Sequence, residues 1–324
     1  MSATIQHGGQ STMSHWPETV VMVTGAAGFI GSHLVTRLRA LGAQVHAVSR
    51  RPQQARHGET WHVASLSDAD VTTRLFRSVR PTLLFHLAGE VTGSRGDEVL
   101  RATLESNVIG GVNVLAAAHE RGIKTVFTGS IEEPRPGNDQ APPSSAYAMS
   151  KWAATGYAQL YHRLWDLPVT VLRPSMVYGP AQPDTTKLVP YVTLCLLRGQ
   201  RPRLTKAAKL ADWIYVDDVV DAFVLAGESD KAIGHTLDIG TGVKTPAHEV
   251  VERLYRITGT GTRPEFGAAP DRPHDITQVG DIAPAADRLG WRPVTELDEG
   301  LRRTVDWYAS QECHKESRTE AGPA

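Results

Sequence analysis

The stretch from residue 20 to residue 42 constrains the fold most strongly, because a short apolar run leads through a glycine-spaced turn into a helical repeat. The run Val20–Thr24 is rich in β-branched residues, which is typical of a strand buried on both faces. Apolar residues then recur from Phe29 to Leu41 with helical spacing, and Gly42 ends the predicted helix. A strand, a glycine turn and a helix in this order predict the first unit of an α/β fold.

The same alternation continues to Arg173 and predicts a doubly wound, mostly parallel sheet of the Rossmann type. After Arg173 the rhythm breaks, and prolines punctuate a loop-rich stretch that contains further helices. Such material is typical of a smaller lobe over the carboxyl ends of the strands, where ligands bind in open α/β sheets. The later predicted strands span 44–48, 61–63, 83–87, 124–128 and 169–172, and the predicted helices span 71–79, 99–121, 146–165, 187–197, 216–226, 245–257 and 297–309.

The chain has 324 residues, which exceeds what a single hydrophobic core usually serves, and we expect four parts. Residues 1–18 are predicted to be a disordered leader, and 19–173 a dinucleotide-binding domain. Residues 174–310 are predicted to be mainly a substrate-binding lobe, with some segments that return to the sheet domain. The polar stretch 311–324 is predicted to be a disordered tail.

Composition excludes several classes of function. The formal net charge of −1 gives no bulk field that favours nucleic acid or an anionic membrane. The two cysteines, Cys195 and Cys313, lie far apart, so neither a disulfide framework nor a metal cluster is readable. That usage suits a reducing cytoplasm, where we expect the protein to reside. No apolar run approaches the roughly 20 residues that span a bilayer, and the N-terminal stretch lacks the apolar region of a signal peptide.

Gly25, Gly28 and Gly31 stand between the first strand and the first helix, which is the context that a dinucleotide-binding turn requires. In such a turn the first glycine permits the tight bend and the second lets the backbone approach a pyrophosphate. The third allows close packing of the helix. The helix N-terminus supplies unpaired N–H donors to the phosphates. We therefore expect a bound pyridine dinucleotide.

The end of the second strand selects between the two dinucleotides. An NAD-binding chain usually has an acidic residue there, which bonds the ribose hydroxyls. This chain has Ser49, Arg50 and Arg51 instead, so no carboxylate repels a 2′-phosphate. The three side chains could bind that phosphate through charge-assisted hydrogen bonds. The sequence favours NADP over NAD.

Tyr147 and Lys151 stand four residues apart in a predicted helix, so their side chains share one face. A free phenol has a pKa of about 10, and a neighbouring cation favours the phenolate. We therefore expect Lys151 to lower the pKa of Tyr147 toward neutrality, where a general acid or base works best.

These residues together resemble the extended short-chain dehydrogenase/reductases, in particular the members that act on nucleotide-activated sugars. The resemblance covers roughly residues 20–307. It rests on Thr24-Gly25-Ala-Ala-Gly28-Phe-Ile-Gly31, His86-Leu-Ala-Gly89, Asn107, Ser130, Tyr147-x-x-x-Lys151, Arg173-Pro-Ser-Met-Val-Tyr178-Gly-Pro180 and Asp281-Ile-Ala-Pro-Ala-Ala-Asp-Arg-Leu-Gly-Trp291.

The resemblance implies a role for each motif. Ser130 orients the substrate oxygen, Tyr147 transfers the proton, and Lys151 holds the nicotinamide ribose. Asn107 supports the site, whereas His86 is expected to pack at a strand end without acting as a base. The implied cofactor-binding set is Gly25, Gly28, Phe29, Ile30, Gly31, Ser49, Arg50, Arg51, Ser65, Leu66, Leu87, Ala88, Gly89, Asn107, Tyr147, Lys151, Pro174 and Val177.

The substrate side departs from the family pattern at one position. Ala211 stands where the family usually places an arginine that holds the diphosphate, and Lys206 or Lys209 could compensate as a point charge. Arg272 matches the family's second diphosphate-contacting arginine. The implied substrate-binding residues are Glu90, Ser130, Glu132, Leu188, Lys209 and Arg272.

The segment Gly129-Ser130-Ile131-Glu132-Glu133 bears on the reaction. It resembles the Gly-Ser-x-Glu-Glu arrangement of reductases that act on nucleotide-linked 4-keto-6-deoxyhexoses. We therefore expect NADPH-dependent reduction of a C4 ketone, on a sugar that is dTDP-linked. A 4-epimerase, or a 4,6-dehydratase that uses Glu132 as a catalytic residue, is an alternative on the same substrates.

Two further alternatives stay open. The missing arginine allows a reductase of a carbonyl that carries no nucleotide. From another class, a catalytically silent NADP-binding sensor or scaffold would have no reason to keep Ser130, Tyr147 and Lys151 together. The family resemblance also implies a homodimer, in which the helices 99–121 and 146–165 pair across a two-fold axis.

Overall fold

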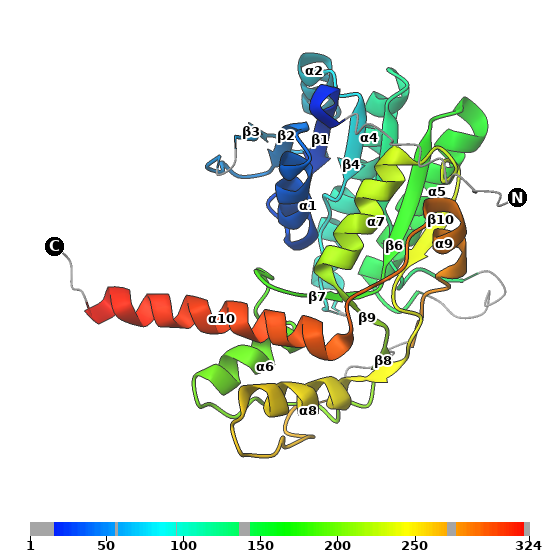
Figure 1. Ribbon diagram of the computed structural model, residues 1–324. Coiled ribbons are helices and arrows are strands. Elements are labelled where there is room, and N and C mark those ends of the chain that lie inside the picture. Colours follow the sequence, from blue (N-terminus) through cyan, green and yellow to red (C-terminus); the bar gives the residue numbers. More distant parts are fainter. Residues whose placement is uncertain (1–15, 56–57, 95, 136–142, 271–276, 321–324) are drawn as a thin grey trace, which may run out of the picture.

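The computed structural model describes residues 16–320 except 56–57, 95, 136–142 and 271–276, and it describes no side chains over 314–320 (Figure 1). Its centre is a seven-stranded sheet in the order β10-β6-β5-β4-β1-β2-β3, and every pairing in it is parallel. The prediction of a doubly wound parallel sheet is confirmed. The strands are β1 (Val20–Thr24), β2 (Gln44–Ser49), β3 (Thr60–Val63), β4 (Leu83–His86), β5 (Lys124–Thr128), β6 (Val169–Pro174) and β10 (Thr236–Ile239).

The apolar runs of the central strands reflect burial on both faces. Val21 and Val23 of β1 pack into one core layer, whereas Met22 between them packs into the opposite layer. Because alternate side chains of a strand point to opposite faces, only a continuous apolar run can satisfy both layers. One layer is covered by α1 (Phe29–Ala40) and α7 (Val216–Glu228), and the other by α2 (Ala69–Val79), α4 (Gly110–His119) and α5 (Ala146–Trp165).

The helix predicted over 99–121 is divided in the structure. It begins as a 3-10 turn, η2 (Asp97–Val99), continues as α3 (Leu100–Thr103) and widens into a π-helical segment, η3 (Leu104–Ile109), before α4. Isolated π-helical turns inside a helix often mark functional sites. This one carries Asn107, which is buried.

A second lobe lies over the carboxyl ends of the strands (Figure 1). Its helices share one continuous apolar core with α1 and α7. Three later elements, α7, β10 and α9 (Ala283–Leu289), belong to the sheet domain instead, so the chain crosses between the lobes more than once. The remaining elements are β7 (Met176–Tyr178), α6 (Leu188–Leu197), β8 (Leu210–Ala211), β9 (Trp213–Tyr215), β11 (Thr245–Pro246), α8 (Ala247–Thr258) and α10 (Leu297–Glu320).

Regular elements extend into parts of both ends that the sequence predicts to be disordered. Residues 16–18 form a 3-10 turn, η1 (Trp16–Glu18), because the indole of Trp16 is buried and its Nε1 donates to Glu228 Oε1 at 2.7 Å. At the other end α10 continues to Glu320, so residues 311–320 are helical. Glutamate, lysine and arginine are good helix formers, and Arg198 Nε bonds Glu312 Oε2 at 2.7 Å. Among the described helices, none has both the length and the apolarity to cross a membrane.

Candidate active site

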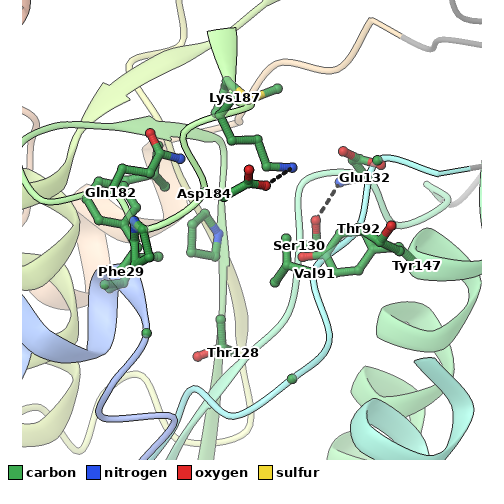
Figure 2. Close-up of a pocket in the computed structure, with 18 of the residues that line it drawn as sticks. Phe29, Val91, Thr92, Thr128, Ser130, Glu132, Tyr147, Gln182, Asp184 and Lys187 are labelled. Atoms are coloured by element: carbon green, nitrogen blue, oxygen red, sulfur yellow. Dashed lines mark hydrogen bonds and ion pairs between the residues drawn. The ribbon is translucent and has the colours of Figure 1, made fainter. Parts of the chain in front are cut away.

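A cavity of about 1550 Å³ lies where the carboxyl ends of the strands meet the second lobe. Its walls include the turns that follow β1, β2, β4, β5 and β6, together with residues of α6 and β8. Figure 2 shows Ser130, Glu132 and Tyr147 on one side of this space and Phe29 and Gln182 on the other, with Lys187 between them in this view. The cavity is therefore long enough to take in both the glycine turn and the Ser130–Tyr147 region.

The glycine turn is shaped for close backbone approach. Gly25 has a φ of +68°, and a Cβ at this position would lie 2.6 Å from the backbone nitrogen of Ala88. A Cβ on Gly31 would lie 2.2 Å from the Gly25 carbonyl oxygen. The N-cap of α1 is Gly28, which offers no side-chain bond to the first N–H groups of the helix. Those groups remain to bind an anion at the cavity wall, and the turn fits the pyrophosphate of a dinucleotide.

At the end of β2, Ser49, Arg50 and Arg51 all line the cavity. Ser49 Oγ donates to the Arg51 carbonyl, which folds the turn back on itself. Arg50 Nη2 lies 3.4 Å from Glu90 Oε2, although the Arg50 side chain is largely exposed. Sequence reasoning found no carboxylate near the arginines, because the acid comes from a segment 40 residues further along the chain.

Tyr147 and Lys151 lie on the first turns of α5, where Ser145 caps the helix by accepting from the backbone N–H of Ala148. Both line the cavity. The buried Lys151 Nζ donates to the Thr128 carbonyl at the end of β5, at 2.8 Å. Burial lowers the pKa of Lys151 to about 8, although the nearby Glu133 acts in the opposite direction. The amine is thus poised to change its charge close to physiological pH.

The expected depression of the Tyr147 pKa is wrong for this arrangement. Burial raises the pKa of Tyr147 above its ordinary value. A hydrogen bond with Ser130 lowers it, and the charges of Glu132 and Glu133 raise it further. The helical spacing identified the lysine as a neighbour, but it contained no information on the burial or on the two carboxylates. Tyr147 is therefore held as a neutral phenol.

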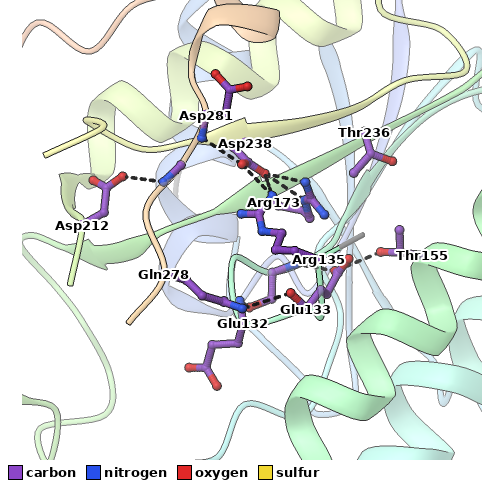
Figure 3. Close-up of polar contacts among 12 residues, drawn as sticks. Glu132, Glu133, Arg135, Thr155, Arg173, Asp212, Thr236, Asp238, Gln278 and Asp281 are labelled. Carbon is purple, nitrogen blue, oxygen red and sulfur yellow. Dashed lines mark hydrogen bonds and ion pairs between the residues drawn. The ribbon is translucent and has the colours of Figure 1, made fainter. Parts of the chain in front are cut away.

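The turn after β5 carries Ser130. Its Oγ accepts from the backbone N–H of Glu132 at 3.2 Å, and its own N–H donates to Glu133 Oε1 at 2.7 Å. Glu132 lines the cavity, whereas Glu133 is buried behind the turn (Figures 2 and 3). Burial raises the pKa of Glu133 to about 7. The two adjacent glutamates thus occupy opposite sides of the Ser130 backbone.

The substrate side of the cavity carries cationic groups that sequence reasoning missed. Lys187 lines it and lies 3.8 Å from Asp184, and Arg203 lines it from the loop that follows α6. Lys187 is the N-cap of α6 and the first residue of the helix predicted over 187–197, whereas Arg203 follows that helix in a loop, and a helical pattern does not say which residue at its end faces a cavity. Lys209 lines the wall as predicted, and Ala211 contributes no charge there. The predicted diphosphate ligand, Arg272, lies outside the described residues.

Of the residues singled out in the sequence, Lys206, Asn107, Glu90 and His86 do not line the cavity. Asn107 Oδ1 accepts from Glu90 N at 2.6 Å, and its Nδ2 donates to the Glu90 carbonyl and to Ser150 Oγ. Asn107 therefore fixes the chain after β4 to α5. Glu90 is held by that contact, and its side chain meets Arg50. Burial lowers the pKa of His86 to about 3, and its Nδ1 lies 2.8 Å from Thr24 Oγ1, so it stays neutral and packs at the strand end.

The remaining predicted residues meet at this one cavity. Those that line it are Gly25, Gly28, Phe29, Ile30, Gly31, Ser49, Arg50, Arg51, Ser65, Leu66, Leu87, Ala88, Gly89, Ser130, Glu132, Tyr147, Lys151, Pro174, Val177, Leu188 and Lys209. A Rossmann sheet with this glycine turn and a Ser-Tyr-Lys set defines a pyridine-dinucleotide-dependent oxidoreductase of the short-chain dehydrogenase/reductase type.

Comparison with known proteins identifies the family. Residues 21–240 match the model of the NAD dependent epimerase/dehydratase family, and the chain belongs to that family. It is 34% identical over 315 residues to a UDP-glucose 4-epimerase of Mycolicibacterium smegmatis, covering 90% of this chain and 98% of the relative. It is 30% identical over 330 residues to a dTDP-glucose 4,6-dehydratase of Streptomyces antibioticus, covering 94% and 97% respectively.

Solved structures agree with this assignment. The crystal structure of UDP-glucose 4-epimerase with UDP-glucose from Thermotoga maritima superposes with a TM-score of 0.81 at 29% identity, over 90% of this chain and 99% of that chain. The UDP-glucose 4-epimerase of Thermus thermophilus in complex with NAD gives a TM-score of 0.78 at 31% identity, over 89% and 98%.

Proposed function

We propose that the protein interconverts the two C4 epimers of a nucleotide-linked hexose through a C4 ketone. The observation that carries the proposal is the meeting of Ser130, Tyr147 and Lys151 on a cavity that begins at the glycine turn and ends in the second lobe. The similarity to UDP-glucose 4-epimerases supports the same reading. The reaction needs a hydride acceptor, a group that moves a proton at the C4 oxygen, and room for a sugar nucleotide.

The residues divide this work. The turn at Gly25 and the N-terminus of α1 would hold the pyrophosphate of the dinucleotide. When bound, the dinucleotide supplies a nicotinamide ring that accepts and returns hydride. Tyr147 removes the proton from the C4 hydroxyl and gives it back, and Ser130 holds the same oxygen. The raised pKa of Tyr147 keeps the phenol protonated, which suits donation to the C4 oxygen in the reductive half of the reaction. In the oxidative half the phenol must release its own proton before the phenolate takes the proton of the C4 hydroxyl, and the positive charge of protonated Lys151 would favour that release.

Epimerisation fits the Ser130 turn better than dehydration does. Elimination across C5 and C6 needs a base for the C5 proton and an acid for the leaving hydroxyl, in addition to the tyrosine. Of the three residues that follow Ser130, only Glu132 combines a carboxyl group with a place on the cavity wall. Ile131 is apolar, and the Glu133 carboxylate is buried behind the turn. Epimerisation needs neither additional group.

A second candidate is NADPH-dependent reduction of the C4 ketone of a nucleotide-linked 4-keto-6-deoxyhexose. Ser49, Arg50 and Arg51 favour it, because they line the cavity where a 2′-phosphate would lie. A net reductase consumes its dinucleotide and exchanges it, whereas an epimerase regenerates it at each turnover. The choice between NADP and NAD is therefore linked to the choice of reaction.

One set of incubations tests these functions. Purified protein is mixed with UDP-glucose or dTDP-glucose and either dinucleotide, and separately with NADPH and a dTDP-4-keto-6-deoxyhexose. A C4 epimer without net change in nicotinamide absorbance supports the epimerase. Stoichiometric loss of NADPH with the keto sugar supports the reductase, and a 4-keto-6-deoxy product from dTDP-glucose identifies a dehydratase. Dinucleotide binding without turnover of any of these sugar nucleotides contradicts the epimerase, the reductase and the dehydratase, and supports a sensor.

We also propose that two copies of the chain associate through α5 and the segment α3–η3. Large apolar side chains are exposed along this surface, although a solvated helix face is usually polar. A second copy would cover them by placing the same helices against their equivalents across a two-fold axis. The exposed residues are Leu100, Leu104, Ile109, Met149, Trp152, Tyr157, Leu160, Leu164 and Trp165.

A further inference from the structure

Glu133 is a buried carboxylic acid beside the active site that does not line the cavity. Its side chain is 1% exposed, and it lies three residues after Ser130. One oxygen, Oε1, accepts two hydrogen bonds, from the Ser130 backbone N–H at 2.7 Å and from Thr155 Oγ1 at 2.9 Å (Figure 3). A single atom therefore joins the Ser130 turn to helix α5.

Thr155 lies on the same face of α5 as the two active-site residues of that helix. Tyr147, Lys151 and Thr155 follow one another at intervals of four residues on α5, so they share one face of the helix. The bond from Thr155 to Glu133 fixes that face relative to the Ser130 turn. The distance between the hydroxyl of Ser130 and the phenol of Tyr147 depends on this relative placement.

The surrounding backbone is adapted to the carboxyl group. A Cβ on Gly129 would lie 2.5 Å from Glu133 Oε1, so only glycine leaves room for the group here. On the other side, Gln278 Nε2 donates to the Glu133 carbonyl oxygen at 3.1 Å, which ties the turn to the segment that precedes α9. The turn is thus held from α5 and from the second half of the chain at once.

The charged groups that act on Glu133 come from two elements, β6 and α5. Arg173 of β6 and Lys151 of α5 act on it electrostatically, and Tyr147 of α5 is influenced by its charge. Arg173 is shared, because Asp238 of β10 accepts from Arg173 Nη2 at 2.8 Å. A second arginine, Arg135, reaches the same aspartate at 2.8 Å (Figure 3). Among the residues that the structure describes, both arginines near Glu133 thus pair with Asp238 instead of with Glu133.

A purely structural role would not require an acid at this position. Burying a carboxyl costs free energy, and a glutamine has an oxygen that could accept the same two bonds. What distinguishes the acid is its charge. When Glu133 is ionised, its charge raises the pKa of both Tyr147 and Lys151.

We propose that Glu133 is a positioning residue, which holds the Ser130 turn against the helix face that carries Tyr147 and Lys151. It acts through its bonds to the Ser130 N–H and to Thr155, and it sets the local charge that the tyrosine and the lysine experience. We call the two hydrogen bonds that Glu133 accepts, from the Ser130 N–H and from Thr155, the clamp. The inference rests on the proposed function, because the clamp positions residues for the same C4 chemistry.

Kinetics of three variants test the clamp. Glu133→Ala removes both bonds, and we expect kcat to fall about a hundredfold, as an ångström-scale misplacement of catalytic groups does. The KM for the sugar nucleotide and the Kd for the dinucleotide should stay near the wild-type values, because Glu133 does not line the cavity. Glu133→Gln should restore most of kcat and move the Lys151-dependent limb of the pH profile, near pH 8, to lower pH, because the Glu133 charge raises the pKa of Lys151. Thr155→Val should lower kcat to a smaller extent.

A matched control separates the clamp from general damage. Thr193 of α6 is also a buried helical threonine, and its hydroxyl has no hydrogen-bond partner within the described part of the chain. Thr193→Val should leave kcat unchanged. The proposal is overturned if Glu133→Ala keeps the wild-type kcat, if Thr155→Val behaves like Thr193→Val, or if Glu133→Gln leaves the pH profile unshifted. If Glu133→Ala does not fold, the pH profile of Glu133→Gln and the kcat of Thr155→Val still test the proposal.

Failure of the clamp and failure of the proposed function give different results. If the wild-type protein binds dinucleotide but turns over no sugar nucleotide, the proposed function is wrong. Crystal structures of Glu133→Gln and Glu133→Ala then test the clamp alone. It predicts an unchanged Ser130 turn with glutamine and a displaced turn with alanine, and an unmoved turn in the alanine variant refutes it.

Discussion

Replacing Asp212 with asparagine should destabilise the protein and weaken sugar-nucleotide binding without affecting the dinucleotide. The buried Asp212 carboxylate lies between β8 and β9 and accepts four hydrogen bonds. Oδ1 takes the N–H and the hydroxyl of Thr241, both at 2.7 Å, and Oδ2 takes the N–H groups of Gly242 and Gly280, both at 3.1 Å. One side chain thus joins three segments of the chain around the substrate side of the cavity.

The loss in free energy of unfolding can be worked out from these four hydrogen bonds. An asparagine that keeps the two Thr241 contacts turns its NH2 group toward the N–H groups of Gly242 and Gly280. The Gly242 N–H can turn to water because that residue is exposed, but Gly280 is buried. An orphaned buried N–H costs about 1–3 kcal/mol, and loss of the charge weakens each Thr241 bond by about 1 kcal/mol. The free energy of unfolding should therefore fall by about 3–5 kcal/mol.

Chemical denaturation of the whole chain, followed by fluorescence, measures this change. Asp306→Asn, at an exposed position on α10, is the matched control and should change stability by less than about 0.5 kcal/mol. In steady-state assays the KM for the sugar nucleotide should rise, while the Kd for the dinucleotide stays constant. An Asp212→Asn protein as stable as Asp306→Asn, with an unchanged KM, would refute the reasoning.

Three further outcomes are expected. Arg50→Ala should weaken NADP binding about 10- to 100-fold and leave NAD binding unchanged, as measured by calorimetry. Arg77→Ala, an exposed arginine on α2, is its control, and equal effects on both dinucleotides would exclude a 2′-phosphate contact. Trp152→Glu or Leu164→Glu should convert a dimer to a monomer in light scattering, and a monomeric wild-type protein contradicts the proposed interface. Because the folded-state pKa of Glu133 is raised from 4.5 to about 7, its contribution to stability is complete below about pH 4.5 and is lost as pH rises through about 7. In Glu133→Gln the free energy of unfolding should not show this decrease with rising pH. The same pH dependence in Glu133→Gln and in the wild-type protein would contradict the raised pKa of Glu133.

Local sequence patterns predicted the sheet and the dinucleotide turn. The glycines around Gly28, and the pair Tyr147 and Lys151, are recognised by spacings of three or four residues. Such a spacing fixes the local geometry of a turn or a helix whatever the tertiary structure around it. The cavity brings these residues together as expected. Sequence reasoning succeeded here because the physical requirement and the pattern lie on the same short segment.

The failures share one cause, which is dependence on contacts between distant segments. Trp16 is held by a hydrogen bond to a residue 212 positions away, and Glu312 of α10 by its contact with Arg198. The raised pKa of Tyr147 reflects burial and two carboxylates on another segment. The hydrogen bond that Glu133 accepts from Thr155 joins residues that are 22 positions apart. None of these contacts leaves a periodic signal.

The most direct test of the central claim is turnover by the Tyr147→Phe variant, measured together with dinucleotide binding. Phenylalanine keeps the ring in its buried place and removes only the group that moves the proton. The account predicts a fall in kcat of about 10²- to 10⁴-fold on the sugar nucleotide, with the Kd for the dinucleotide unchanged. A Tyr147→Phe protein that turns over its substrate at the wild-type rate would contradict it.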